Sequence, residues 1–291
     1  MDRSLEFFKM EGIGNDYIYF DFTNIFFSRE NICKEEIPKL CDRRFGVGGD
    51  GVVVLTKSDR AEIKMLMWNS DGSESKICGN ALRCVSYYWY RKENKNQFYI
   101  ETEAGIHKSE ILKDTYPDGL IKVNMGQPIF DKNLIPYLGD SFTENVYRFY
   151  DESILPYEGI VLSMGNPHCV FFVDSFDKIP IHKVGSLIEN HRLFPQRTNV
   201  EFVKINPDST LQQITWERGS GETLACGSGA CAVLVASVLT KKLPTKNEIH
   251  LKGGILEIEW DQKENQVYMI GKASFVYKGE LIKKFQLFDN L

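Results

Sequence analysis

The feature that most constrains this chain is a short motif that occurs twice, about 150 residues apart. Residues 78–80 (Cys-Gly-Asn) open an apolar run that ends near Tyr88, and residues 226–228 (Cys-Gly-Ser) open another that ends near Leu239. Each motif stands where a helix would begin, so free backbone N–H groups and the positive end of the helix dipole would face whatever lies beside the sulfur. The duplication predicts two similar halves that together form a carboxylate site with two thiols.

The regions around the two motifs are rich in short β-type runs separated by turn residues. In the first half we expect strands at residues 7–10, 17–21, 52–55, 63–68, 98–102 and 121–125. In the second half we expect them at residues 159–163, 170–173, 200–205, 211–216, 255–260 and 267–271. The second half is therefore predicted to contain a similar series of short strands to the first.

The two runs behind the motifs are the strongest helix candidates. The run after Cys78 is amphipathic, with Arg83 and Ser86 off its apolar face. Residues 230–239 are apolar all round and too few to cross a bilayer, so this helix should be buried on every side. Two further segments, 30–41 and 178–190, have the pattern of surface helices. A central helix surrounded by strands would account for the all-round burial expected of residues 230–239.

These patterns predict an α/β (α+β) protein of two pseudo-symmetric domains, each a bent sheet or barrel around one helix. We place the first domain at 1–126 and the second at 127–276, with 277–291 returning to the first. The active site is expected in the cleft between the domains, where the helix N-termini face each other.

Composition limits the partners of the chain. A formal net charge of -5 and a pI near 5.7, with Lys and Arg scattered, argue against nucleic acid or an acidic membrane surface as a partner. A small-molecule substrate is the better expectation. The first residues lack a signal-peptide pattern and no run of apolar residues is long enough for a membrane span, which predicts a cytoplasmic protein.

The seven cysteines are odd in number and spread along a chain without a signal peptide, so we expect reduced thiols rather than a disulfide framework. No Cys-x-x-Cys pair occurs and the five histidines lack metal-ligand spacing, so no metal is predicted. Cys33, Cys41, Cys84 and Cys231 are expected on apolar faces. Cys78 and Cys226, at the start of helices and beside glycine, should instead have a lowered pKa.

Two thiols that flank one carbon suit a specific reaction. One thiolate removes a proton from one face while the other thiol delivers a proton to the opposite face, which inverts a stereocentre. An α-amino acid carbon is the natural candidate for this chemistry. We expect no cofactor, because pyridoxal phosphate needs a Schiff-base lysine and a phosphate cradle, and the Gly-rich stretches 46–51 and 9–15 are typical of tight turns.

Several polar residues next to predicted strands are candidates for substrate contacts. Each of the asparagines at these positions follows or precedes a strand: Asn15, Asn69, Asn166 and Asn199. Glu217-Arg218 follows the strand that ends at Trp216 and offers an acceptor for an ammonium group and a guanidinium fork for a carboxylate. His168 lies in an Asn-Pro loop, where a site role and a capping role are both open.

Taken together, these segments resemble the diaminopimelate epimerase family over nearly the whole chain. The motifs that carry the resemblance are residues 8–17 (FKMEGIGNDY), 44–51 (RFGVGGDG), 69–73 (NSDGS), 78–80 (CGN), 165–169 (GNPHC), 197–200 (RTNV), 217–219 (ERG), 226–229 (CGSG) and 276–280 (VYKGE). The resemblance implies interconversion of LL- and meso-2,6-diaminopimelate in lysine and peptidoglycan precursor synthesis. It also implies a reaction without a cofactor, as in the rest of the family.

The resemblance also implies a role for each matching residue. Cys78 and Cys226 would be the two acid/base groups, assisted by His168 and Glu217. The reacting carboxylate would be held by the backbone N–H groups of Gly79, Asn80, Gly227 and Ser228. The distal carboxylate would be recognised by Asn69, Asn166, Asn199 and Arg218, and the amino groups would lie near Asn15 and Glu217. A homodimer is expected by the same resemblance.

Three positions depart from the family pattern. Gly51 stands where many members have Gln, so a side-chain contact to the substrate amine would be missing or replaced. Ser228 stands for the commoner Thr and Ala81 for a Gly, and both changes preserve size or the hydroxyl. The residues leave three alternatives open: a racemase of another amino acid such as histidine on the same fold, a redox dithiol protein, and a non-catalytic amino-acid-binding module.

Overall fold

The computed structural model describes residues 5–139, 141–143, 146–241, 243–282 and 286–288. Contacts between Cα atoms divide the chain into two compact units. Unit 1 runs to Val123 and resumes at Gly271, and unit 2 spans Asn124–Ile270. Each unit therefore has its own core, and the chain returns to unit 1 after leaving unit 2.

Unit 1 contains one long helix and a set of strands. Its elements are β1 (Leu5–Gly12), β2 (Asn15–Phe22), the 3-10 helices η1 (Arg29–Asn31) and η2 (Lys34–Glu36), α1 (Ile37–Cys41), β3 (Gly51–Thr56), β4 (Ile63–Asn69), β5 (Glu74–Ser75), α2 (Gly79–Glu93), β6 (Gln97–Thr102), β7 (Gly105–Thr115) and β8 (Asp118–Gly126). The last strand, β18 (Gln266–Leu281), pairs with β1 through residues 274–281.

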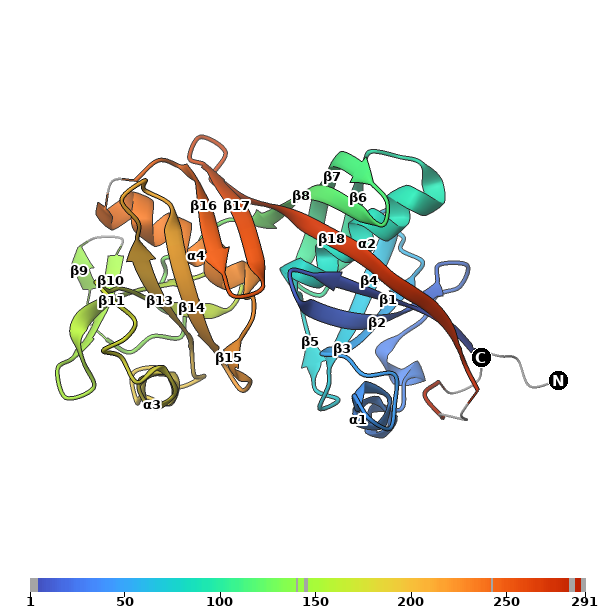
Figure 1. Cartoon of the computed structure of the whole chain (residues 1–291), viewed down its shortest axis with the longest axis horizontal. Helices are drawn as coiled ribbons and strands as arrows, with labels where there is room; N and C mark the ends of the chain where they lie inside the picture. The colour runs from blue at the N-terminus through green and yellow to red at the C-terminus, as the bar shows by residue number, and fades with distance from the viewer. Residues whose placement is uncertain (1–4, 140, 144–145, 242, 283–285, 289–291) are drawn as a thin grey trace. The chain divides into compact units, whose positions relative to one another are not determined.

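The strands of unit 1 close into a barrel. Among the described residues, the pairings run β1–β2–β3–β4–β6–β7–β8–β18 and return from β18 to β1. The β2–β3 and β4–β6 pairs are parallel, and the β1–β18, β1–β2, β3–β4, β6–β7 and β7–β8 pairs are antiparallel. The α2 helix contacts β1, β2 and β7 from inside this ring (Figure 1).

Unit 2 repeats this order of elements. Its elements are β9 (Ser141–Thr143), β10 (Val146–Asp151), β11 (Leu155–Ser163), β12 (Pro167–Phe172), α3 (Ile181–Glu189), β13 (Asn199–Ile205), β14 (Leu211–Glu217), β15 (Gly221–Thr223), α4 (Gly227–Lys241), β16 (Lys246–Leu251) and β17 (Gly254–Asp261). The first residues of β18 complete it by pairing with β17.

The strand pairings show that the two units share one topology. β12–β13 and β14–β16 are the parallel pairs of unit 2, as β2–β3 and β4–β6 are in unit 1. Val52 lies opposite Trp68 in the β3–β4 ladder, and Val200 lies opposite Trp216 in the β13–β14 ladder. Each cysteine of the duplicated motif follows its tryptophan by ten residues. The duplication inferred from the sequence thus extends to strand register.

The central helix of each unit is buried along most of its length. α4 is buried from Gly229 through Ser237, as its all-round apolar pattern predicts. α2 differs from its prediction, because Arg83 and Ser86 are also fully buried. The guanidinium of Arg83 donates to the Lys272 carbonyl (3.1 Å) and the Ser86 hydroxyl donates to the Leu82 carbonyl (2.7 Å). A closed ring of strands leaves no solvent-facing side for the helix, so its polar residues must bond internally.

A second, smaller layer covers the outer face of each sheet. In unit 1, Ile37 and Leu40 of α1 pack in one cluster with Val52 and Trp68. In unit 2, residues of α3 pack with Val200, and Trp216 lies against the same cluster. The helix between the parallel strands of each unit therefore packs over the valine and tryptophan that the two ladders share.

The segment before β3 corrects one prediction. A single helix over 30–41 was expected, but the chain forms η1, η2 and the short α1 instead. Pro38 stands in the first turn of α1, where its missing N–H is tolerated, but a continuous helix through this position would lose a backbone hydrogen bond. The other expected surface helix is confirmed as α3.

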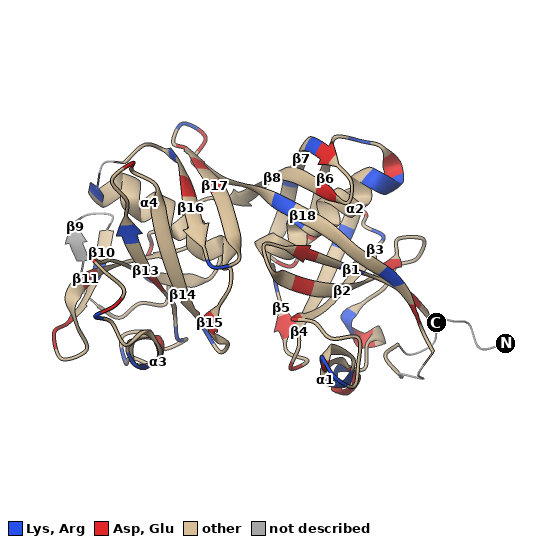
Figure 2. Ribbon diagram, viewed as in Figure 1, with Lys and Arg blue, Asp and Glu red and all other residues tan. Residues whose placement is uncertain are grey.

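Figure 2 shows acidic and basic residues interspersed over both units. In the described part of the chain, no helix is long and apolar enough to cross a bilayer.

Candidate functional site

Both cysteines of the duplicated motif occupy the residue that caps a helix. Cys78 has extended backbone angles (φ −133°, ψ 120°), and its carbonyl accepts the first helical bond of α2 from the N–H of Leu82 (2.8 Å). The carbonyl of Cys226 accepts the corresponding bond of α4 from Ala230 (3.0 Å). The first N–H groups of each helix have no carbonyl within the helix to bond, so they form an anion-binding end beside each sulfur.

Cys78 lies beside two of the predicted substrate-binding residues. Its partly exposed thiol donates to Asn15 Oδ1 (3.3 Å), and the same oxygen accepts from Asn80 Nδ2 (3.4 Å). The Asn15 Nδ2 group donates to Asp50 (2.7 Å). Because a carboxylate only accepts, Asp50 fixes the amide of Asn15 so that its oxygen faces the thiol. Unit 1 thus brings Asn15, Cys78 and Asn80 together.

Asp50 is itself part of a charged network that sequence reasoning did not assign to the site. Arg43 forms ion pairs with Asp50 (2.9 Å) and Asp16 (2.6 Å), and Lys9 pairs with Asp16 (2.6 Å). Burial raises the pKa of Asp16, but the hydrogen bonds from Arg43 and Lys9 outweigh it and hold the pKa below the usual value. The carboxyl group of Asp16 therefore stays ionised near neutral pH.

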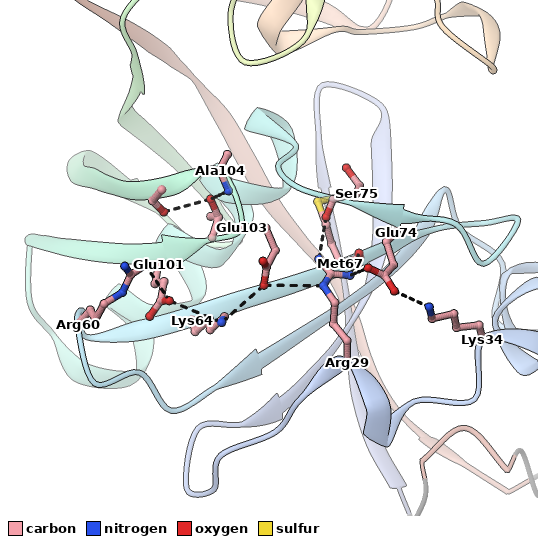
Figure 3. Close-up of polar contacts among 12 residues, drawn as sticks. Arg29, Lys34, Arg60, Lys64, Met67, Glu74, Ser75, Glu101, Glu103 and Ala104 are labelled. Carbon is pink, nitrogen blue, oxygen red and sulfur yellow. Dashed lines mark hydrogen bonds and ion pairs between the residues drawn. The ribbon is translucent and has the colours of Figure 1, made fainter. Parts of the chain in front are cut away.

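The hairpin that leads to Cys78 is held by Arg29. Its guanidinium donates to the carbonyls of Met67 in β4 (3.2 Å) and Ser75 in β5 (3.0 Å), and lies over the Trp68 ring (5.0 Å). Figure 3 shows Arg29 inside a series of ion pairs that continues on both sides. The members of this series are Lys34, Glu74, Arg29, Glu103, Lys64, Glu101 and Arg60.

Asn69 lies at the end of β4, in the turn of this hairpin. Its Nδ2 group donates to the Ser73 hydroxyl (2.9 Å), and its backbone N–H donates to the Ser73 carbonyl (2.8 Å). The backbone N–H of Ser70 donates to the carbonyl of Asp50 (3.0 Å). The turn with Asn69 is therefore tied to Asp50, which also orients Asn15.

Cys226 lies in a different environment, with only 5% of its surface exposed. Its sulfur accepts from the N–H of Gly229 (3.3 Å) and lies 3.6 Å from the Ser228 hydroxyl. Burial, together with the carboxylates of Glu217 and Glu201, raises the pKa of Cys226 well above its usual value, against the lowering effect of Ser228 and Gly229. The expectation of a lowered pKa is wrong for this thiol, because desolvation and nearby anions outweigh the helix terminus.

His168 is fully buried and both of its ring nitrogens are engaged. Nδ1 lies 2.7 Å from Glu201 Oε1, and Nε2 lies 2.9 Å from Asn166 Oδ1. The histidine therefore links a predicted substrate-binding residue, Asn166, to the buried carboxylate that acts on Cys226. Glu201 was missed by sequence reasoning, although an acidic residue within the apolar run 200–203 was a usable signal, since unpaired carboxylates are rarely buried.

Asn199 and Arg218 meet at the turn after β14. The side-chain oxygen of Asn199 accepts from the backbone N–H of Arg218 (3.0 Å), and its Nδ2 group donates to the carbonyl of Pro167 (2.9 Å). The exposed Arg218 side chain donates to the Gln196 carbonyl (3.1 Å). Glu217 accepts from the hydroxyl of Thr223 (2.5 Å). Unit 2 thus gathers Asn199, Glu217 and Arg218 around one turn.

The remaining predicted residues lie in the first turns of the two helices. Gly79, Asn80 and Gly227 are buried, and Ser228 is partly exposed.

The departure at Gly51 has a steric reason, because a Cβ atom there would lie 2.1 Å from the Trp68 carbonyl oxygen and 2.8 Å from the Tyr17 ring. The backbone of β3 approaches its neighbours too closely for a side chain at this position. In the described part of the chain, no group of three His, Cys, Asp or Glu residues is arranged to hold a metal ion.

Comparison with solved structures places this geometry in a known fold. A hydroxyproline epimerase from Agrobacterium vitis superposes with a TM-score of 0.70 at 13% identity, covering 96% of this chain and 93% of that one. A PhzF-family phenazine biosynthesis protein from Bacillus anthracis gives 0.65 at 16% identity, covering 97% and 100%. The fold is the one shared by the diaminopimelate epimerase, proline racemase and PhzF proteins, which confirms the predicted fold class.

Sequence comparison is more specific. A family model described as diaminopimelate epimerase matches residues 7–130 and 160–276. A diaminopimelate epimerase from Methanococcus maripaludis is 45% identical over 284 residues, covering 95% of this chain and 99% of the relative. One from Leptospira biflexa is 45% identical over 280 residues, with the same coverage. The chain belongs to the diaminopimelate epimerase family, as its motifs predict.

Proposed function

We propose that the chain is an isomerase that interconverts LL- and meso-2,6-diaminopimelate without a cofactor, with Cys78 and Cys226 as the two acid/base groups. The observation that supports this most directly is that the two cysteines cap equivalent helices in two units of the same topology, in a chain of this family. The reaction serves lysine and peptidoglycan precursor synthesis. We also propose that the enzyme is cytoplasmic and homodimeric, as the family resemblance implies.

The reaction requires the two thiols to reach opposite faces of one α-carbon. One sulfur, as thiolate, removes the proton, and the other, as thiol, delivers a proton to the far side, so the working state holds a single shared proton. The two sulfurs exchange roles when the reaction runs backwards. The reacting carboxylate would lie on the N–H groups at the two helix starts, contributed by Gly79, Asn80, Gly227 and Ser228.

The carbanion is the difficult intermediate, because it develops next to an already negative carboxylate. A helix terminus supplies only about 0.3–2 kcal/mol. Each oriented N–H donor adds about 3–4 kcal/mol where charge develops. These contributions reach the low end of the roughly 8–23 kcal/mol that enzymes supply, so positioning and exclusion of water must provide the rest.

The surroundings of Cys226 suggest how substrate binding activates this thiol. The carboxylate of Glu217 helps to raise the pKa of Cys226. By the family resemblance, the substrate amino group lies near Glu217 and Asn15. An ammonium group there would neutralise the field of Glu217 and lower the pKa of Cys226 when, and only when, substrate is bound. Arg218, Asn69, Asn166 and Asn199 would recognise the distal carboxylate.

The test is proton exchange at the α-carbon in heavy water, with purified enzyme and no added cofactor. We expect exchange and epimerisation with both diaminopimelate isomers and none with histidine as the control amino acid. Cys78→Ala and Cys226→Ala should each lower turnover by roughly 10²- to 10⁴-fold, the usual contribution of a general acid or base. Exchange with histidine only, or full turnover in either variant, would refute the proposal.

A second experiment addresses the distance between the two thiols. Sulfurs that share one carbon should form a disulfide when the site is empty and mildly oxidised. Activity should then fall and return with reductant, while Cys33→Ala, which removes a partly exposed thiol bonded to Glu35, should respond as wild type does. Activity that is indifferent to the oxidant would contradict the proximity that the mechanism requires.

A further inference from the structure

Glu189, the last residue of α3, carries a buried carboxylate with three donors around it. Its Oε2 atom accepts from the indole N–H of Trp216 (2.8 Å). Its Oε1 atom accepts from the backbone N–H of Gly219 (2.8 Å) and from the guanidinium of Arg197 (3.1 Å). Only 6% of the side chain is exposed. One carboxylate therefore joins α3, the end of β14, the turn after β14 and the loop before β13.

The segments that Glu189 joins are those that carry the predicted carboxylate-binding residues of unit 2. Arg218 is the direct neighbour of Gly219, whose N–H is bonded to Glu189. Asn199 lies two residues after Arg197, and its side chain holds the backbone N–H of Arg218 (3.0 Å). The turn is thus fixed from one side by Asn199 and from the other by Glu189.

Packing around Trp216 keeps Glu189 in this place. An added Cβ at Gly185, one turn earlier in α3, would lie 2.6 Å from the Trp216 ring, so the helix lies directly against the indole. The ring of His182 meets the same indole edge-on at 5.7 Å. Because α3 and Trp216 are in close contact, the carboxylate has little freedom to move away from the turn.

The charges of this cluster add an electrostatic argument. Two guanidinium groups, those of Arg197 and Arg218, accompany the single carboxylate of Glu189. Partial desolvation lowers the pKa of Arg218, the field of Arg197 lowers it further, and Glu189 acts in the opposite direction. Glu189 therefore offsets the repulsion between the two cations.

We propose that Glu189 is a positioning residue that sets Arg218 in place to bind the distal carboxylate of the substrate. The inference rests on the proposed function and adds to it a determinant of dicarboxylate specificity. Glu189 acts through the turn rather than by touching the substrate. An amide cannot replace it, because Gln would point an NH₂ group at one of three hydrogen-bond donors.

The experiment is a double-mutant cycle on kcat and KM with diaminopimelate. We expect Glu189→Gln and Glu189→Ala to lower kcat/KM about 10- to 100-fold, with most of the loss in KM. Arg218→Ala should cause a similar loss. In the Arg218→Ala background, Glu189→Gln should cost less than about threefold more, because the residue through which it acts is already gone.

The control is Glu222→Ala, which removes a carboxylate from β15 whose partners are Lys252 and His182. This variant should keep kcat/KM within about twofold of wild type, since ion pairs of this kind contribute little. Glu189→Gln keeps the size of the side chain, so it serves if Glu189→Ala fails to fold. Equal losses for Glu189→Gln with and without Arg218 would show a general structural role and overturn the inference. A wild-type enzyme without epimerase activity would instead overturn the proposed function itself.

Discussion

The hairpins that lead to the two cysteines have the same backbone but opposite supports. Trp68 and Trp216 occupy the same register position, ten residues before each cysteine. In unit 1 a cation, Arg29, lies over the indole and donates to strand carbonyls. In unit 2 an anion, Glu189, accepts the indole N–H and a backbone N–H. Duplication preserved the shape of the hairpin, while the charge that holds it diverged.

The sulfurs differ in the same way. Cys78 is partly exposed and donates to the side chain of Asn15, whereas Cys226 is buried and accepts from the backbone of Gly229. The third helical residue is Ala81 after Cys78 and Gly229 after Cys226. One half therefore holds its thiol by a side-chain amide, and the other by the helix itself. The two halves of a symmetric reaction are built with different local chemistry.

The largest difference in activity between the two units should come from exchanging Ala and Gly at the third residue of each central helix. An added Cβ at Gly229 would lie 2.7 Å from Glu201 Oε1 and 3.2 Å from the Cys226 sulfur. Overpacking of this kind costs about 1–3 kcal/mol, so Gly229→Ala should lower kcat/KM roughly 5- to 150-fold. The matched change Ala81→Gly should cost about 1 kcal/mol of unfolding free energy or less, with activity retained. Steady-state kinetics and urea unfolding measure both, and similar activity losses would contradict the comparison.

The second largest effect concerns the stability that Arg29 gives to the hairpin of unit 1. Arg29→Ala removes two partly buried hydrogen bonds from a charged donor to strand carbonyls, and should lower the free energy of unfolding by about 1.5–3 kcal/mol. Arg60→Ala, at the exposed end of the same series of ion pairs, should lower it by about 1 kcal/mol or less. Urea denaturation compares the two variants. A loss for Arg60→Ala as large as that for Arg29→Ala would show that the series acts as a whole.

The smallest effect concerns the pKa of Cys226. A nearby carboxylate disfavours the thiolate and raises its pKa, so Glu217→Gln should lower it and move the alkylation profile of Cys226 to lower pH. Alkylation near neutral pH should become severalfold faster, as measured by mass spectrometry of the peptide that contains Cys226. Glu222→Gln, whose carboxylate pairs with Lys252, is the matched control and should leave the profile unchanged. An unshifted profile in Glu217→Gln would show that Glu217 does not contribute and that burial and Glu201 raise the pKa.

Local pattern predicted much of the fold. The alternating runs predicted the principal strands, and the apolar residues after Cys226 predicted a helix buried on all sides, because periodicity records which faces are apolar. The pattern after Cys78 gave a wrong prediction for the burial of Arg83. A charged residue is predicted to be exposed unless its hydrogen-bond partner in the interior is known. That partner, the carbonyl of Lys272, lies 189 residues further along the chain.

By itself, the sequence determined that the protein is a duplication, that each cysteine begins a helix, and that the chain belongs to the diaminopimelate epimerase family. Helix starts and strand periodicity depend on residues that are close in sequence, so they can be predicted from short segments. Only the tertiary structure decided that Glu201 and Glu217 act on Cys226, that Asp50 orients Asn15, and that Glu189 holds the turn of Arg218. Desolvation and Coulomb energy depend on distances in space, which the chain sets only when it folds.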